Sequence, residues 1–204
     1  MGYKTTNAYT GEVEKEFDYA TDAEVEAALD KAHEAFKVWS KNSYAERGEI
    51  MHRVADLFRE REEETAAIVT KEMGLPINTS VYLAGEMVAQ MLDYYADNAE
   101  EFLKPEKVEV NPAAGTAELV YQPLGVIFAV EPWNATVHQA VRPACGNLMV
   151  GNTVVLKHAA IVPQSAEAIE KIFLDGGVPK VSSRTSAPTT TRPSASLPTI
   201  VSAA

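Results

Sequence analysis

Cysteine and positive charge are both scarce in this chain of 204 residues. The single cysteine, Cys145, excludes an internal disulfide and indicates a reducing compartment such as the cytoplasm. Lysine and arginine together number 18, against 29 acidic residues, so the formal net charge is −11. An acidic surface argues against binding to nucleic acid and to anionic membranes.

Long apolar runs are also missing. No stretch of about 18 consecutive apolar residues occurs, so the sequence predicts no membrane-spanning helix. The N-terminus lacks the basic-then-apolar pattern of a secretory signal. What remains is an ordinary globular composition, 46% hydrophobic and 23% charged. We therefore expect a cytoplasmic protein that binds no nucleic acid, no membrane and no metal.

The stretch from Leu124 to Lys157 predicts a βαβ unit. Val126 to Val130 is a continuous apolar run, typical of a strand buried on both faces, and Pro132 ends it. Apolar residues then recur with the period of a helix, and Thr153 to Leu156 reads as a second buried strand. Two strands joined by one helix should be parallel, with a right-handed crossover. The predicted fold class is therefore α/β.

Helices and two hairpins are predicted on either side of this unit. The expected segments are a hairpin around Thr10-Gly11, a helix capped by Thr21 or Asp22, a helix opened by Ser43 and Glu46, a helical pattern up to Met73, a long helix from Thr79 or Ser80 through Tyr95, a hairpin pairing 107–110 with 117–121, and a helix containing Ala166 to Phe173. The apolar positions of the first two helices recur at helical spacing, so we expect these positions to face inward.

The last 24 residues differ in composition from everything before them. Val181 to Ala204 contains no acidic residue, glycine or aromatic residue, and it cannot bury enough apolar surface to offset its ordering entropy. We therefore expect one folded portion over residues 1–180 and an unrelated, disordered tail over 181–204. One possible DNA sequence for Leu197 to Ala204, shifted by two bases, reads Ala-Asp-Asp-Arg-Ile-Arg-Gly, which suggests a frameshifted continuation.

Two motifs in the βαβ unit carry a resemblance to a known family. Pro132-Trp133-Asn134, followed about two dozen residues later by Gly151-Asn152-Thr153-Val154-Val155-Leu156-Lys157, resembles the aldehyde dehydrogenase superfamily. Lys157-His158-Ala159 resembles one branch of the succinate-semialdehyde dehydrogenases. The resemblance covers about residues 1–180. It implies N-terminal helices, a β-hairpin arm near 107–121 and an incomplete Rossmann-like cofactor domain.

The resemblance also implies a catalytic role for one polar side chain and a substrate-binding role for another. Asn134 matches the family's oxyanion donor, although an asparagine here could instead cap the next helix. Arg142 lies eight residues later and matches the arginine that binds the free carboxylate of succinate semialdehyde, because guanidinium pairs with carboxylate through two parallel bonds. An exposed helical arginine without a ligand is the alternative.

Cofactor contacts follow from the same motifs. Pro132 and Trp133 belong to the cofactor-binding turn, and Lys157 matches the lysine that contacts the adenosine ribose. A solvated lysine is the alternative reading. Many NAD-specific members carry glutamate three residues later, where this chain has Ala160. Without that carboxylate a 2′-phosphate should be tolerated, which favours NADP or the use of both NADP and NAD.

The remaining catalytic groups of the family have no counterpart in the sequence. Cys145 lies in the apolar stripe of the crossover helix, which favours a packing role over a nucleophilic one. His138 is expected on a helix face rather than in catalysis. We therefore expect a truncated NAD(P)-dependent aldehyde dehydrogenase, most like those that oxidise succinate semialdehyde to succinate, that is inactive alone. The alternative is a non-catalytic fragment that binds nucleotide or pairs with other subunits, including homo-oligomers, through the hairpin arm.

Overall fold

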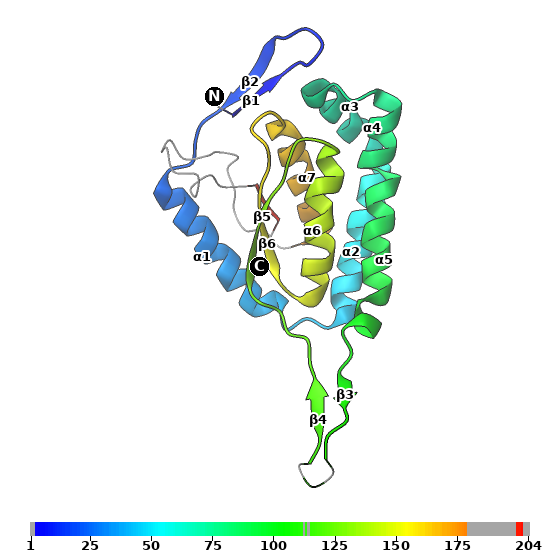
Figure 1. Ribbon diagram of the computed structural model, residues 1–204. Helices are drawn as coiled ribbons and strands as arrows, with labels where there is room; N and C mark the ends of the chain where they lie inside the picture. The colour runs from blue at the N-terminus through cyan, green and yellow to red at the C-terminus, as the bar shows by residue number, and fades with distance from the viewer. Residues whose placement is uncertain (1–2, 112, 114, 179–198, 202–204) are drawn as a thin grey trace.

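The computed structural model describes residues 3–111, 113, 115–178 and 199–201, and these form a mixed α/β fold (Figure 1). The elements in chain order are β1 (Tyr3–Thr6), β2 (Val13–Phe17), α1 (Asp22–Trp39), α2 (Tyr44–Glu60), α3 (Glu62–Met73), α4 (Ile77–Ala84), α5 (Glu86–Phe102), β3 (Glu106–Val108), β4 (Ala117–Leu119), β5 (Val126–Val130), α6 (Thr136–Val150), β6 (Thr153–Lys157), α7 (Pro163–Asp175) and β7 (Thr199–Val201). The described strands form three sheets, ordered β1-β2, β3-β4 and β5-β6-β7.

The predicted βαβ unit is confirmed. Strands β5 and β6 are parallel and pair in register from Val126 with Thr153 to Val130 with Lys157. Along β6 the side chains alternate between two cores, since Val155 packs with α1 whereas Val154 and Leu156 pack with the larger helical cluster. Helix α1 therefore covers one face of the sheet, and α6 and α7 cover the other (Figure 1).

Burial of β5 on both faces was a wrong prediction, although it holds for β6. The side chains of Phe128 and Val130 are 48% and 59% exposed. Both share the face of Val126, but neither joins the core beneath α1, although Val155, the register partner of Phe128 on β6, does. Strand β5 is also the edge of the described sheet, so an apolar run alone did not distinguish it from the central β6.

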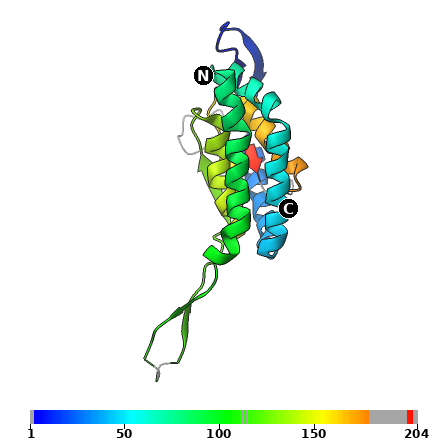
Figure 2. The same cartoon turned by 90° about the vertical axis from the view of Figure 1, so that its right-hand side faces the viewer.

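Two helix starts follow the sequence closely. Thr21 caps α1 and Ser43 caps α2, each in a reciprocal capping box with the glutamate three residues later, Glu24 and Glu46. Helices α2 and α5 then pack along most of their length and against α6, as the two views of Figures 1 and 2 show. The centre of this helical body is fully buried.

The single long helix expected from Thr79 or Ser80 is corrected to two helices. Helix α4 begins at Ile77, directly after Pro76, and Gly85 separates it from α5. A Cβ atom added to Gly85 would lie 2.4 Å from the Cβ atom of Glu62. The first turn of α3 thus approaches so closely that only glycine fits, which places the break at this residue.

A buried arginine joins the ends of three helical segments. Arg47 on α2 is 4% exposed and donates to the carbonyl oxygen of Met149 at 3.1 Å, near the end of α6. It also donates to the carbonyl oxygen of Asn42, in the turn between α1 and α2. Beside it the indole Nε1 of Trp39 donates to the Leu148 carbonyl at 2.9 Å. The last carbonyls of α6 therefore receive their hydrogen bonds from α1 and α2.

A buried carboxylate plays the corresponding role at the start of α7. Glu72 on α3 is 5% exposed and accepts four hydrogen bonds. Two come from the backbone N–H groups of Gln164 and Ser165, both at 2.9 Å, and one from the Ser165 hydroxyl at 2.8 Å. The fourth comes from the Thr5 hydroxyl on β1 at 2.6 Å. One side chain thus caps α7 and fixes the N-terminal hairpin to the body.

The second hairpin, β3-β4, projects away from the helical body as a narrow ribbon (Figures 1 and 2). Its position agrees with the sequence prediction, with shorter strands than expected. The apolar side chains of Val108, Leu119, Val120 and Tyr121 are between 43% and 51% exposed. The described hairpin therefore presents apolar surface to the solvent.

The predicted boundary near residue 180 and the tail 181–204 lie almost entirely outside the described residues. Within the tail only Thr199–Val201 is described, and it is a short strand rather than the unstructured chain expected there. Strand β7 runs antiparallel to β6, with Thr199 opposite Leu156. Across the described part of the chain, no helix combines the length and the apolar character needed to cross a bilayer.

Candidate cofactor and substrate site

The predicted cofactor residues lie together at one edge of the sheet. The parallel register places Val130 beside Lys157, and the backbone N–H of Glu131 donates to the Lys157 carbonyl at 3.0 Å. The turn that carries Pro132, Trp133 and Asn134 therefore starts next to the end of β6. Ligands of open α/β sheets bind at this carboxyl edge of the strands.

The turn after β5 is closed by its own side chains and leaves the Asn134 amide free. Thr136 is buried, and its hydroxyl donates to the Trp133 carbonyl at 2.7 Å. Ala135 adopts the left-handed conformation, with φ 49° and ψ 47°, and is the N-cap residue of α6 without any side-chain cap. Asn134 is exposed and does not cap the helix. This arrangement supports a ligand-facing amide over the capping alternative.

His158 fastens this turn to the end of β6, a function that sequence reasoning missed. Its imidazole is 3% exposed, and Nδ1 accepts the backbone N–H of Ala159 at 3.0 Å. Nε2 therefore carries the proton and donates to the Thr136 carbonyl, also at 3.0 Å. Burial lowers the pKa of His158. The residue appeared in the sequence only as part of a motif, and its partner 22 residues away could not be read from the pattern.

Lys157 and Ala160 lie at the same edge, against the N-terminal hairpin. The Lys157 ammonium is 6.0 Å from the centre of the Tyr3 ring, and burial lowers the pKa of this lysine. The Ala160 carbonyl accepts the backbone N–H of Lys4 at 3.4 Å. No acidic side chain forms a salt bridge with Lys157 among the described residues. A phosphate group would therefore meet a cation that has no carboxylate partner.

Arg142 lies about two turns along α6 from the Asn134 turn and keeps its charge largely in solvent. Its side chain is 59% exposed, and its Nη2 atom is 3.8 Å from a carboxylate oxygen of Glu131. Burial raises the pKa of Glu131, an effect that the charge of Arg142 opposes. His138, one turn before Arg142, has its pKa lowered by burial and then by the same guanidinium. The arginine is thus paired loosely and is open to a competing carboxylate.

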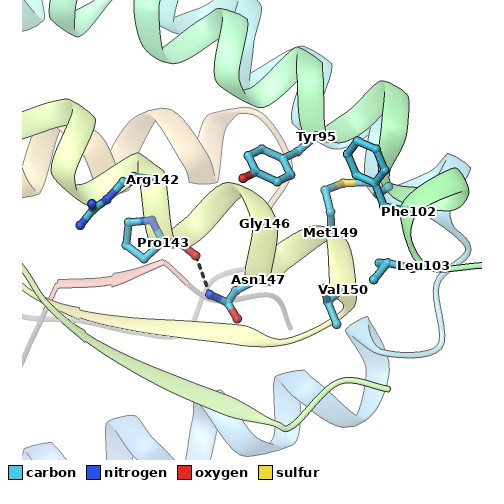
Figure 3. A pocket seen from close by; sticks show the side chains of 10 residues that line it. Tyr95, Phe102, Leu103, Arg142, Pro143, Gly146, Asn147, Met149 and Val150 are labelled. Carbon is cyan, nitrogen blue, oxygen red and sulfur yellow. Dashed lines mark hydrogen bonds between the residues drawn. The ribbon is translucent and has the colours of Figure 1, made fainter. Parts of the chain in front are cut away.

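A cleft of about 300 Å³ runs between α5 and α6 and has Arg142 at one end (Figure 3). Its walls are mostly apolar, and Phe102 lies at the end opposite Arg142. The lining side chains are Tyr95, Ala99, Phe102, Leu103, Arg142, Pro143, Gly146, Asn147, Met149 and Val150. The lining of the cleft is therefore mostly apolar, with Arg142 as its one positively charged side chain.

Cys145 does not belong to this site. It is fully buried in the helical core, and burial raises the pKa of its thiol to about 11. Its Sγ atom lies 3.3 Å from the Arg142 carbonyl oxygen within α6. A buried thiol with so high a pKa is a packing residue rather than a nucleophile. No group of acidic, histidine and cysteine side chains in the described ranges is arranged to hold a metal ion.

Comparison with known proteins assigns the fold and the edge just described to one family. A model of the aldehyde dehydrogenase family matches residues 1–183. This chain belongs to the aldehyde dehydrogenase family. The sequence resemblance based on the Pro132–Asn134 and Gly151–Lys157 motifs is therefore confirmed.

Two curated relatives of this chain are named for one substrate. The chain is 41% identical over 180 residues to a succinate-semialdehyde dehydrogenase [NADP(+)] of Deinococcus radiodurans and covers 37% of that protein. It is 40% identical to a probable succinate-semialdehyde dehydrogenase [NADP(+)] of Synechocystis and covers 39% of it. In both alignments 87–88% of this chain is matched. The chain thus spans little more than a third of the length of these relatives.

Solved structures agree with this assignment. The succinic semialdehyde dehydrogenase of Streptococcus pyogenes, in complex with NADP+, is 39% identical and superimposes with a TM-score of 0.81. A structure described for cofactor and substrate selection by Gox0499 is 40% identical, with a TM-score of 0.84. The chain covers 38% and 39% of these two structures. The described fold is therefore that of the first part of an aldehyde dehydrogenase.

Proposed function

We propose that this chain supplies the cofactor-binding part of an NADP-dependent succinate-semialdehyde dehydrogenase. The observation that carries the proposal is the shared carboxyl edge of β5 and β6, where the turn with the exposed Asn134 follows β5 and Lys157, which has no salt bridge among the described residues, ends β6. In this proposal the Asn134 amide stabilises an oxyanion and the Lys157 ammonium contacts the adenosine end of a dinucleotide. The resident cofactor would supply the hydride acceptor.

The preference for NADP rests on charge. A ribose 2′-phosphate needs a cation without a competing carboxylate, and Lys157 with Ala160 three residues later meets that condition. Both curated relatives named above carry NADP(+) in their names. We propose that NADP binds more tightly than NAD, with some binding of NAD.

The proposed substrate class rests on Arg142. Its guanidinium is mostly exposed and has only a loose partner in Glu131. A short aldehyde with a carboxylate at its far end could pair that carboxylate with Arg142 while its carbonyl faces the Asn134 turn. Succinate semialdehyde has this form.

We propose that the chain does not oxidise aldehydes alone. The reaction of the family needs a reactive thiolate and a base that activates water, and the one cysteine of the chain is buried in the core. Purified protein incubated with succinate semialdehyde and NADP should form no NADPH above the blank. Turnover that disappears in Cys145→Ala would contradict this.

Trp133 provides a direct test of cofactor binding. It is half exposed and belongs to the binding turn, whereas the second tryptophan, Trp39, is buried. Adding NADP should quench the fluorescence of the Trp133 indole, and Trp133→Phe should remove the response. Lys157→Gln should weaken NADP more than NAD, while Lys104→Gln, on the surface near the hairpin, serves as the control. Equal losses for both nucleotides in Lys157→Gln would contradict the assigned contact with the 2′-phosphate.

A second candidate function, subunit pairing, is favoured by the exposed hairpin β3-β4. Two-stranded hairpins are marginal by themselves, and this one exposes apolar side chains far from the body (Figure 2). We propose that it pairs with a second copy of the chain. Light scattering should report an oligomer that dissociates in the double variant Val108→Asp, Leu119→Asp, and a monomer in the unchanged chain would contradict this.

A further inference from the structure

We infer that His158 is a positioning residue, which holds the Asn134 turn and the cofactor-contacting end of β6 in one fixed arrangement. This inference rests on the proposed function, since it concerns how the two halves of that site keep their relative position. The carrying observation is geometric: both ring nitrogens of a buried imidazole are used, one on each half of the site.

The first half is the end of β6. The Ala159 N–H donates to Nδ1 at 3.0 Å, so the ring is fixed on the backbone between Lys157 and Ala160. The Tyr3 hydroxyl also donates to the His158 carbonyl at 3.4 Å, which adds the N-terminal hairpin to this anchor. The ring therefore cannot rotate without breaking the contact with Ala159.

The second half is the turn that presents Asn134. The Nε2–H group donates to the carbonyl of Thr136, two residues after Asn134. Thr136 closes the turn through its hydroxyl, and the left-handed Ala135 between them gives the turn a strained backbone. A turn that stores strain returns to other conformations when its contacts are lost, and the bond from His158 opposes that.

This arrangement needs a neutral imidazole in one tautomer. A second proton on Nδ1 would point at the N–H of Ala159 and abolish the first contact. Burial lowers the pKa of His158, backbone contacts with Thr136 and Glu131 oppose that shift, and the charge of Lys157 adds to it. Lys157 on β6 acts on the ring through its charge and Glu131, at the end of β5, through its backbone, while Tyr3 on β1 contacts the His158 carbonyl. The site should therefore keep its arrangement at neutral pH and lose it on acidification.

The test uses the full chain, labelled with ¹⁵N, and three variants. His158→Gln keeps a side-chain N–H near the position of Nε2 but cannot titrate, His158→Phe removes both contacts, and His33→Gln changes an exposed histidine elsewhere. We expect the His158 ring to show the Nε2–H tautomer and to protonate at lower pH than an ordinary histidine. The side-chain amide of Asn134 and the backbone amide of Thr136 should shift with the His158 midpoint in the unchanged chain. In His158→Gln they should not titrate, and in His158→Phe they should be displaced at every pH.

Cofactor affinity gives the second readout. NADP binding should weaken about 2- to 12-fold when His158 is protonated, the range expected for one hydrogen bond. It should be nearly independent of pH in His158→Gln and weak throughout in His158→Phe, with His33→Gln like the unchanged chain. Unshifted Asn134 and Thr136 signals in His158→Phe, or a His158 ring that titrates in the ordinary range of a histidine, would overturn the inference. Failure of the unchanged chain to bind NADP at any pH would refute the proposed function instead, and the amide and imidazole signals would still decide the positioning role.

Discussion

Replacing Glu72 should cost the fold more stability than any exposed substitution, because this carboxylate is the shared cap of α7 and anchor of β1. In Glu72→Ala the backbone N–H groups of Gln164 and Ser165 lose their acceptors at 2.9 Å inside the protein. A buried donor left unsatisfied costs about 1–3 kcal/mol. Two such donors and the lost hydroxyl contacts give an expected loss of about 3–5 kcal/mol in the free energy of unfolding.

Thr5→Val is the matched control. It removes only the hydroxyl that donates to Glu72 at 2.6 Å and keeps the volume of a fully buried side chain. The cap of α7 stays intact, so the expected loss is about 1 kcal/mol. Urea unfolding followed by circular dichroism measures both losses, and hydrogen exchange at Gln164 and Ser165 should accelerate in Glu72→Ala only. Equal losses in the two variants, or a loss below about 1 kcal/mol in Glu72→Ala, would refute the capping argument.

Three further outcomes follow from the structure. At pH 8 a thiol reagent should label Cys145 at least about a hundredfold more slowly in the folded than in the urea-unfolded chain, because raising the pKa from 9.0 to about 11 removes most of the thiolate; similar rates would show that the thiol is accessible. Ala135→Gly should raise the free energy of unfolding by about 0.5–1 kcal/mol, since glycine relieves the left-handed strain but costs entropy, and a lower urea midpoint would contradict that conformation. In a chimera that joins this segment to the rest of a curated relative, Arg142→Ala should lower kcat/KM for succinate semialdehyde about 10- to 150-fold. The kcat/KM for an uncharged aldehyde of similar length should not change. Equal losses of kcat/KM for both aldehydes would make Arg142 a structural residue.

The elements that the sequence predicted well are those determined by neighbouring residues. The capping box predicted at Ser43 and the cap predicted at Thr21 or Asp22 depend on residues within one turn, and the helix of the βαβ unit follows from its 3.6-residue period. The predicted core role of Cys145 came from the same periodicity. Local rules were sufficient because each of these features is satisfied within one or two turns of chain.

The predictions that failed depended on distant partners. Gly85 breaks a helix because Glu62, on another helix, approaches it, and nothing near Gly85 in the sequence shows that contact. The exposure of Phe128 depends on how far α1 extends across the sheet, since α1 covers its neighbour Val155 on β6 and leaves Phe128 on the edge strand exposed. In the site, the motif identified Lys157 and Asn134, but the imidazole of His158 that joins their segments became visible only in three dimensions.

The buried guanidinium of Arg47 has a consequence for the order in which the chain can assemble during synthesis. Its acceptor on Met149 is 102 residues later, and that of Trp39 on Leu148 is 109 residues later. At a translation rate of about 5–20 residues per second, Arg47 is synthesised roughly 5–20 s before Met149. During that interval Arg47 must remain hydrated, so α1 and α2 cannot adopt their final packing. The hydrogen bonds of Trp39 and Arg47 can therefore form only after the last turn of α6 has been synthesised.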